Sequence, residues 1–434
     1  MKIYYYIIVV GFLLLSCNRT KQSDSAEKQV GITQNSALTE SQVVVYQNTE
    51  FPDIQEDTNQ DGSLTEIPVD ITPSRAFFEI PVDIDQNYSL PLSEIAEEIT
   101  AIELEFTDES PINPDNIQRI LISENHIITV ETVLTSGSTP KILVFSKDGK
   151  FLNRIGSVGQ GPGEYTWILN AALDEKNKRL FITTLFSNKI ICYSLDGKFL
   201  KEITRPIKSA DQFLLDINCI DDEVLLLVNK QTSEAEISSQ TSFLYRLNDE
   251  FQVIDSCFIR KNDFGSSGGG IMRNYSPDFI LKGNPSVYLY NSELYTKRGA
   301  PVEKVIRDTL YRIEHNQLVP ELKLKFRNDG IDRTGKFIDI NNIFRSTRYI
   351  FAVYQIYETE FYTRIYHHFC YDTKTGKSYN MRDGYTDDIN GIEKRIGIRP
   401  SVTDSETIYY WHTNMKPEDK EEPNPTLYIV KLKQ

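Results

Sequence analysis

Histidine and cysteine, the residue types that most often take part in chemistry, are sparse in this chain of 434 residues. Its five histidines form no HExxH motif, and His367 and His368 are neighbours that would point to opposite faces of a strand. The later cysteines lie 27, 38 and 113 residues apart, which fits neither a zinc site nor a CxxC motif. We therefore expect no metal, no cofactor and no catalytic residue. Buried free thiols, with one disulfide as the alternative, are expected at Cys192, Cys219, Cys257 and Cys370.

Two glycine-containing segments look like ligand-binding loops but lack essential parts. Gly159-Gln-Gly161 could cradle a phosphate, yet no Lys-Ser/Thr pair and no helix follow it. Segment 57–64 has oxygen ligands at the first, third and fifth positions of a calcium loop and Gly62 at the sixth. Its twelfth position is Pro68, where the loop needs a glutamate. Both segments are expected to be turns.

Arginine and aromatic residues in long loops are better candidates for a binding site. Segments 261–275, 327–348 and 382–399 are long links between strand groups, and they carry several arginines. A guanidinium binds two oxygens of a carboxylate, sulfate or phosphate at once, and aromatic faces suit sugar rings or apolar side chains. The alternative is that these arginines pair with nearby carboxylates and only hold the loops. The candidate ligand-binding residues are Tyr165, Trp167, Arg273, Tyr275, Arg333, Arg345, Arg395 and Arg399.

Short strands joined by tight polar turns dominate the chain from about residue 77. Segments 141–152 and 189–200 are near copies, 48 residues apart, and each contains an Asp-Gly pair that supplies the positive backbone angles of a hairpin turn. Weaker copies bring the number to six. This recurrence predicts an all-β fold: a six-bladed β-propeller with four-stranded antiparallel blades, its ring closed by an N-terminal strand at 99–106 that pairs into the last blade. A solenoid and a pair of β-sandwiches are the alternative architectures.

The N-terminus has the pattern of a bacterial lipoprotein signal. Lys2 precedes an apolar run of 13 residues, too short to span a bilayer core of ~30 Å as a helix. The run ends at Leu14-Leu15-Ser16-Cys17, which looks like a lipobox with Cys17 as the lipidated residue. An ordinary cleaved signal or a short anchor is the alternative. Residues 18–75 are polar and predict a flexible tether. The expected domains are therefore 1–17 (signal), 18–75 (tether) and 76–434 (propeller).

One loop carries a resemblance to a known family. The run from Gly156 to Tyr165, GSVGQGPGEY, resembles the inter-blade signature of NHL-like β-propellers. Segment 90–105, together with the lipobox, is similar to the opening of bacterial six-bladed β-propeller lipoproteins. The resemblance covers about residues 77–434. It implies a propeller fold and a lipid-anchored place at the outer membrane, facing the periplasm or the cell surface. It implies no single activity, because such propellers include binders, scaffolds and a few enzymes.

The charge balance narrows the choice of partners. A net charge of −15 argues against nucleic-acid binding and against electrostatic docking on anionic lipid, so membrane attachment would depend on the lipid anchor only. We expect a non-enzymatic propeller that binds a glycan or an envelope protein partner through loops on one face. The alternative is a lyase or hydrolase acting on an extracellular polysaccharide or peptide. Its site would lie at the channel mouth, where histidines or carboxylates from different blades could converge.

Overall fold

The computed structural model describes residues 78–434, which belong to one compact unit that includes Arg75–Gln434. Short internal gaps interrupt this range at 133–137, 186–187, 205–211, 235–236, 266–269, 273–277, 285, 293, 298–299, 302–306, 327–335, 359–362 and 415–421. Within the described residues the fold is all-β apart from the short helix α1 (Leu92–Ile95) and a 3-10 turn, Pro114–Asn116. No helix among them is long and apolar enough to cross a membrane.

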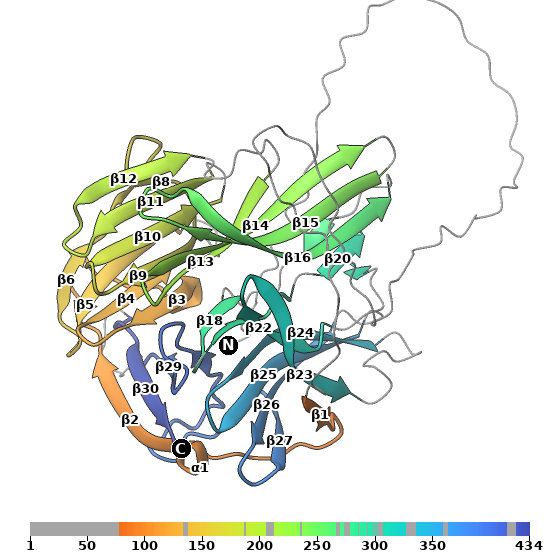
Figure 1. The fold of residues 1–434 in the computed structure, drawn as a ribbon. Coiled ribbons are helices and arrows are strands. Elements are labelled where there is room, and N and C mark those ends of the chain that lie inside the picture. The colour runs from red at the N-terminus through yellow and green to blue at the C-terminus, as the bar shows by residue number, and fades with distance from the viewer. Residues whose placement is uncertain are drawn as a thin grey trace, which may run out of the picture. The chain divides into compact units, whose positions relative to one another are not determined.

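Six sheets form the blades of a propeller, which confirms the predicted all-β, six-bladed fold with four-stranded blades (Figure 1). Blade 1 contains β3 (Ile117–Ile122), β4 (His126–Glu131), β5 (Lys141–Ser146) and β6 (Phe151–Arg154). Blade 2 contains β9 (Ile168–Asp174), β10 (Arg179–Thr184), β11 (Lys189–Ser194) and β12 (Phe199–Thr204). Blade 3 contains β13 (Gln212–Ile220), β14 (Glu223–Glu234), β15 (Ile237–Leu247) and β16 (Val253–Gly265).

The other three blades follow the same antiparallel pattern. Blade 4 contains β18 (Ile280–Lys282), β19 (Val287–Leu289), β22 (Thr309–Glu314) and β23 (Gln317–Phe326). Blade 5 contains β24 (Lys336–Arg345), β25 (Tyr349–Glu358), β26 (Thr363–Asp372) and β27 (Lys377–Arg382). Blade 6 combines β28 (Arg399–Pro400), β29 (Thr407–His412) and β30 (Thr426–Leu432) with β2 (Ala96–Glu103). Two small sheets, β7 (Ser157–Val158) with β8 (Glu164–Tyr165), and β17 (Gly270–Met272) with β20 (Leu294–Lys297) and β21 (Ala300–Pro301), lie outside the blades.

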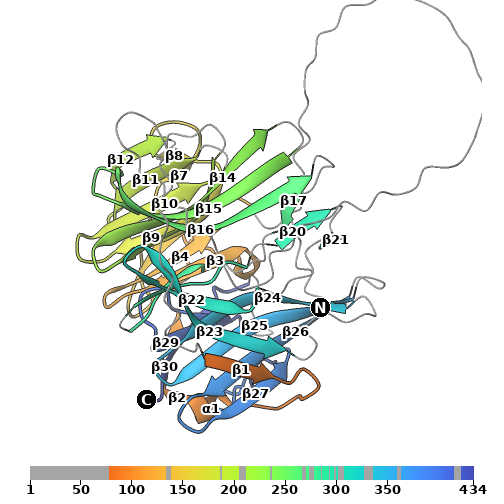
Figure 2. The same ribbon diagram turned by 45° about the vertical axis from the view of Figure 1, so that its right-hand side comes forward.

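The N-terminal segment of the unit contacts three successive blades (Figure 2). Strand β1 (Phe78–Val82) adds to the outer edge of β23 in blade 4 and runs parallel to it, which the sequence did not indicate. The chain then passes blade 5, where the Tyr88 amide donates to the Asn380 carbonyl at 2.7 Å. After α1, strand β2 pairs antiparallel with β30, from Ala96 opposite Leu432 onward.

The Asp-Gly hairpins form as predicted, with one difference in their backbone. Only the glycines have positive φ, +86° at Gly149 and +87° at Gly197, whereas neither aspartate does. The Gly149 amide donates to the Ser146 carbonyl at 3.0 Å, and the Ser146 amide donates to the Lys150 carbonyl at 2.9 Å. This is the pattern of a type I turn followed by a left-handed glycine bulge, so one residue rather than two requires the left-handed region.

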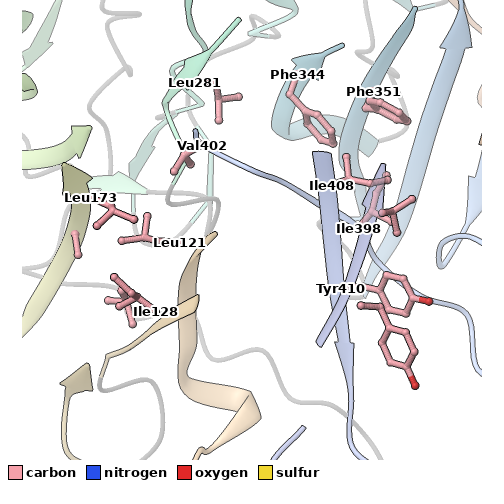
Figure 3. Close-up of a cluster of buried hydrophobic side chains, with 14 of the residues drawn as sticks. Leu121, Ile128, Leu173, Leu281, Phe344, Phe351, Ile398, Val402, Ile408 and Tyr410 are labelled. Carbon is pink, nitrogen blue, oxygen red and sulfur yellow. The ribbon is translucent and has the colours of Figure 1, made fainter. Parts of the chain in front are cut away.

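Buried apolar layers fill the space between neighbouring blades. The largest cluster contains Leu121 and Ile128 of blade 1 with Leu173 of blade 2, and it continues to Ile408 and Tyr410 of blade 6 (Figure 3). Separate clusters lie between blades 2 and 3, 3 and 4, 4 and 5, and 6 and 1. The cysteines in the described residues are free, as expected. Three of the four thiols are buried: Cys192, Cys257 and Cys370. Burial raises the pKa of Cys192 to about 11.

Candidate functional site

A fully buried arginine occupies the place where the first strands of several blades meet. Arg119 of β3 donates from Nε to Asp278 Oδ1 at 2.8 Å and from Nη2 to Asp216 Oδ1 at 2.9 Å. Its Nη1 donates to the carbonyls of Ala171 at 3.0 Å and Ile217 at 3.1 Å. One guanidinium thus connects β3 with β9, with β13 and with Asp278, which lies two residues before β18.

The carboxylate of Asp216, like the guanidinium of Arg119, forms several hydrogen bonds. Its Oδ2 accepts the amides of Phe279 and Ile280, both at 3.0 Å, and its Oδ1 also accepts from Asn170 at 2.6 Å. Complete burial raises the pKa of Asp216 to about 6, although Arg119 and the backbone amide of Ile280 act in the opposite direction. We assign a structural role to this network, because its charged groups are enclosed and already paired with each other.

The histidine and acidic side chains of the described residues are the groups that could form a metal-binding arrangement. In the described part of the chain no group of three or more histidine, cysteine, aspartate or glutamate side chains could hold a metal ion. His367 stacks on Tyr354 with ring centroids 5.1 Å apart, whereas His368 packs against Tyr385. Burial lowers the pKa of His368 to about 4, so this imidazole is neutral at physiological pH.

A cavity of about 360 Å³ lies at the end of the inner strands where the tight turns are. Blades 6, 1 and 2 contribute to it, and its size falls within the range of about 300–1,000 Å³ typical of ligand pockets. We call it the turn-side pocket. Its walls combine aliphatic, hydroxyl, ammonium and carboxylate groups, from Ile122, Ser123, Glu124, Lys147, Leu173, Glu175, Ser401, Thr403, Asp404, Thr407, Ile429 and Lys431.

Two lysines line this pocket, and they differ in their hydrogen-bond partners. Lys431 Nζ donates to Asp404 Oδ2 and to Thr407 Oγ1, both at 2.7 Å. Burial raises the pKa of Asp404, but the hydrogen bonds that this carboxylate accepts from Lys431 and from the Thr407 hydroxyl hold its pKa below the usual value. Lys147 Nζ donates to the Ser123 carbonyl at 2.9 Å. Partial burial and the charge of Lys431 lower the pKa of Lys147. The pocket therefore contains two lysine ammonium groups together with carboxylate and hydroxyl oxygens that can accept hydrogen bonds.

Glu175, in the β9–β10 turn, also lines the pocket. Its Oε1 accepts from Asn125 Nδ2 at 3.2 Å and lies 3.4 Å from His126 Nδ1. Its Oε2 is enclosed and receives no hydrogen bond from the residues that the structure describes. This oxygen has no exposed surface, so it is not available to a ligand in the pocket.

Those residues proposed from the sequence that the structure describes do not line the turn-side pocket. Tyr165 is fully buried and donates its hydroxyl to the Ile155 carbonyl at 2.8 Å, so it offers no surface to a ligand, and Trp167 is half-buried. Arg399 donates to the Gln118 carbonyl at 2.7 Å and stacks on Trp411 at 4.7 Å.

Two further arginines differ in how far they are engaged. Arg395 is exposed and donates to the hydroxyls of Ser89 and Thr386. Arg345 was expected in a link between blades, but it ends strand β24 at the opposite, tight-turn side. There it pairs with Glu321 and lies over the Tyr288 ring at 5.8 Å. The expected link at 327–348 is shorter than the sequence indicated, because ten of its residues belong to β24.

Other predicted positions lie outside the described residues. These are the lipidation site Cys17, the calcium-like segment 57–64, and three of the ligand-binding candidates, Arg273, Tyr275 and Arg333. The sequence reasoning missed the turn-side pocket altogether. Its residues come from turns at 122–124, 147, 173–175 and 401–407 and from the last strand, so no local motif joins them. The only signal was the recurrence of the hairpins, which places such turns at one end of every blade.

The fold defines the class of this protein: a six-bladed β-propeller, with a buried ion-pair network centred on Arg119 and a hollow at the turn side whose lining is partly polar and partly apolar. Within that class, the chain belongs to the family described as "Domain of unknown function (DUF4934)", whose model matches residues 77–433. No curated protein matches the chain.

Several solved structures are similar in fold. A DUF4221 family member from Bacteroides vulgatus is 10% identical, with a TM-score of 0.37, over 78% of this chain and 97% of that one. An endo-arabinase from Bacteroides thetaiotaomicron is 11% identical, with a TM-score of 0.30, over 80% and 98% of the two chains. The β-propeller domain of the Trilobed protease from Pyrococcus furiosus is 9% identical, with a TM-score of 0.34, over 73% and 82%. At these values none of them assigns an activity to this chain.

Proposed function

We propose that this protein is a non-enzymatic binding propeller of the cell envelope that holds a glycan or a segment of a partner protein in its turn-side pocket. The observation that carries the proposal is the pocket itself, a hollow of about 360 Å³ lined by both apolar and polar groups from three blades. A rigid ring of blades keeps such groups in place without a conformational change, which suits recognition. The proposal thus places the binding site on the turn side, whereas the sequence favoured the link side.

The pocket supports binding better than hydrolysis or elimination. General acid–base catalysis by carboxyl groups uses a residue whose pKa has been raised toward neutrality. Burial raises the pKa of Glu131 to about 7 and that of Asp216 to about 6, but neither residue lines the pocket. Within the pocket, the carboxylate of Asp404 is fixed by Lys431 and Thr407.

The proposed envelope location is based on the N-terminal sequence. The pattern up to Cys17 supports a lipid anchor, and residues 18–75 would serve as the tether between the anchor and the propeller. Metabolic labelling with a fatty-acid probe tests the anchor. Wild-type protein should incorporate the label, and Cys17→Ser should not.

Glycan arrays and crosslinking on intact cells test the binding function. We expect the full chain, purified in detergent, to bind a specific glycan or to crosslink to one envelope protein. Lys147→Ala should weaken this interaction, because it removes an ammonium group from the pocket wall. Arg395→Ala, which changes an exposed arginine outside the pocket, is the matched control. Loss of binding in Arg395→Ala with full retention in Lys147→Ala would return the site to the link side.

A further inference from the structure

Strand β1 belongs to a hexapeptide that occurs twice in the chain. Residues 79–84 read Glu-Ile-Pro-Val-Asp-Ile, and residues 66–71 read the same, starting 13 positions earlier. The second copy, 79–84, contains all of β1 except Phe78, and β1 is the outermost strand of the blade 4 sheet. The first copy lies outside the described residues, in the segment that we propose as the tether. The structure thus shows what one copy binds, and the sequence supplies an identical segment close to it.

The site that holds the second copy is the outer side of β23 from Leu322 to Phe326, which we call the blade 4 edge (Figure 2). Strand β1 pairs with this edge in parallel along its whole length. Ile80 and Val82 join the apolar cluster between blades 4 and 5, where they are 0% and 3% exposed, and Ile84 packs against the same cluster. Half of the hexapeptide therefore supplies buried apolar surface.

The other three positions suit an edge strand as well. Glu79 Oε2 accepts from Lys325 Nζ at 3.0 Å. Pro81 is exposed in the outermost strand, where a sheet tolerates the missing N–H group. Asp83 Oδ1 accepts the Asp85 amide at 3.1 Å, at the turn that follows the strand. Because the first copy repeats all six residues, it can form the same strand pairing, the same burial and the same ion pair.

We infer that the blade 4 edge is a strand-exchange site, at which residues 66–71 of the same chain replace residues 79–84. The residues between the two copies then join the loop that leads from the edge to blade 5. The exchange shortens the proposed tether by 13 residues, which is at most about 45 Å of extended chain, and so brings the propeller closer to its anchor. It needs no ligand in the turn-side pocket, so it goes beyond the proposed binding function and does not depend on it.

The second copy is the preferred occupant of the edge in the wild-type chain. In the exchanged state residues 72–84 form an additional loop, and the 3/2-power dependence of loop closure on length disfavours this state roughly fiftyfold. The first copy also has Thr65 where the second has Phe78, whose ring centroid lies 5.7 Å from that of Tyr371. The exchanged state is therefore a minor state of the wild type, and it becomes dominant when the second copy is weakened.

Crosslinking between introduced cysteines tests the exchange in the full chain, purified in detergent. Position 325 lies opposite position 81 in the β1–β23 register. Lys325→Cys is therefore combined with Pro81→Cys to report the second copy and with Pro68→Cys to report the first. Its combination with Pro73→Cys is the matched control, because this proline lies between the copies. The initial rate for Pro68→Cys should be roughly fiftyfold below that for Pro81→Cys and above that of the control.

Weakening the second copy should reverse the preference. Ile80→Asp with Val82→Asp places charges at buried positions, which disfavours binding of that copy. The crosslinking rate of Pro68→Cys should then rise by about ten- to fiftyfold. Adding Ile67→Asp with Val69→Asp should abolish this rise, whereas the same pair in the otherwise wild-type chain should leave the Pro81→Cys crosslink unchanged.

Two results would overturn the inference. The first is an equal rate for Pro68→Cys and Pro73→Cys in the otherwise wild-type chain, a comparison that holds whether or not the weakened variants fold. The second is a crosslink that doubles the molecular mass on a denaturing gel, because the strand would then come from another molecule and not from the same chain.

Discussion

Replacing Arg119 by methionine tests the assignment of a structural role to the axis. The substitution keeps much of the side-chain volume but removes the guanidinium that is paired with Asp216 and Asp278 at 2.9 and 2.8 Å. All three side chains are at most 1% exposed, so water cannot replace the lost partner. Removing one member of a buried ion pair costs about 3–5 kcal/mol, because the remaining charges stay enclosed. We expect a loss of this size in the free energy of unfolding.

Urea denaturation followed by tryptophan fluorescence measures this loss. The control is Lys325→Met, which removes one partner of an exposed ion pair with Glu79, 63% and 45% exposed, and should cost about 0–1 kcal/mol. Combining Arg119→Met with Asp216→Asn and Asp278→Asn should recover part of the stability, because no buried charge then lacks a partner. A loss below about 1 kcal/mol in Arg119→Met alone would refute the reasoning, since the carboxylates would have to find water or other partners.

Three further perturbations test other parts of the fold. Burial raises the folded-state pKa of Glu131 to about 7, so the folded protein binds the carboxyl proton of Glu131 more tightly than the unfolded chain does. The protein therefore loses stability as pH rises from about 4.5 to 7. Glu131→Gln should flatten that part of the pH profile in thermal melts. Gly149→Ala should destabilise the chain by more than about 1 kcal/mol, because φ is +86° and a Cβ would lie 2.1 Å from the Glu103 carbonyl oxygen. Gly391→Ala, where φ is +74° and the space is open, should cost less, and equal losses in urea titrations would contradict the steric argument. Ile80→Ala should cost about 2–5 kcal/mol, because this side chain of β1 is fully buried against blades 4 and 5, and a loss near zero in the same titration would mean that β1 does not contribute to the core.

Local chemistry in the sequence was enough to predict the repeating hairpins. Gly149 and Gly197 mark turns because a positive φ is accessible to glycine at little cost, whatever the rest of the chain does. The apolar runs that became β4, β5, β10 and β11 are nearly continuous because both faces of each sheet pack against neighbouring blades. Six such hairpins at similar intervals were sufficient to predict the number of blades.

The sequence did not indicate which side chains are buried, or at which end of its blade a residue lies. Tyr165 follows the Gly-rich loop and looked exposed, but it is enclosed with its hydroxyl bonded to the Ile155 carbonyl. Arg345 looked like a residue of a link, but β24 continues through it and carries it to the opposite end of the blade. Strand ends depend on pairing with β25, a tertiary contact that the local sequence does not encode.

The sequence by itself therefore determined the blade as a unit: its hairpin turn, its strand order and its repetition along the chain. Tertiary structure alone decided the sites. Arg119 meets Asp216 and Asp278 across 97 and 159 positions of sequence, and the turn-side pocket joins residues from Ile122 to Lys431. Such neighbours arise only when the blades pack around a common axis, because that packing brings equivalent ends of distant strands together.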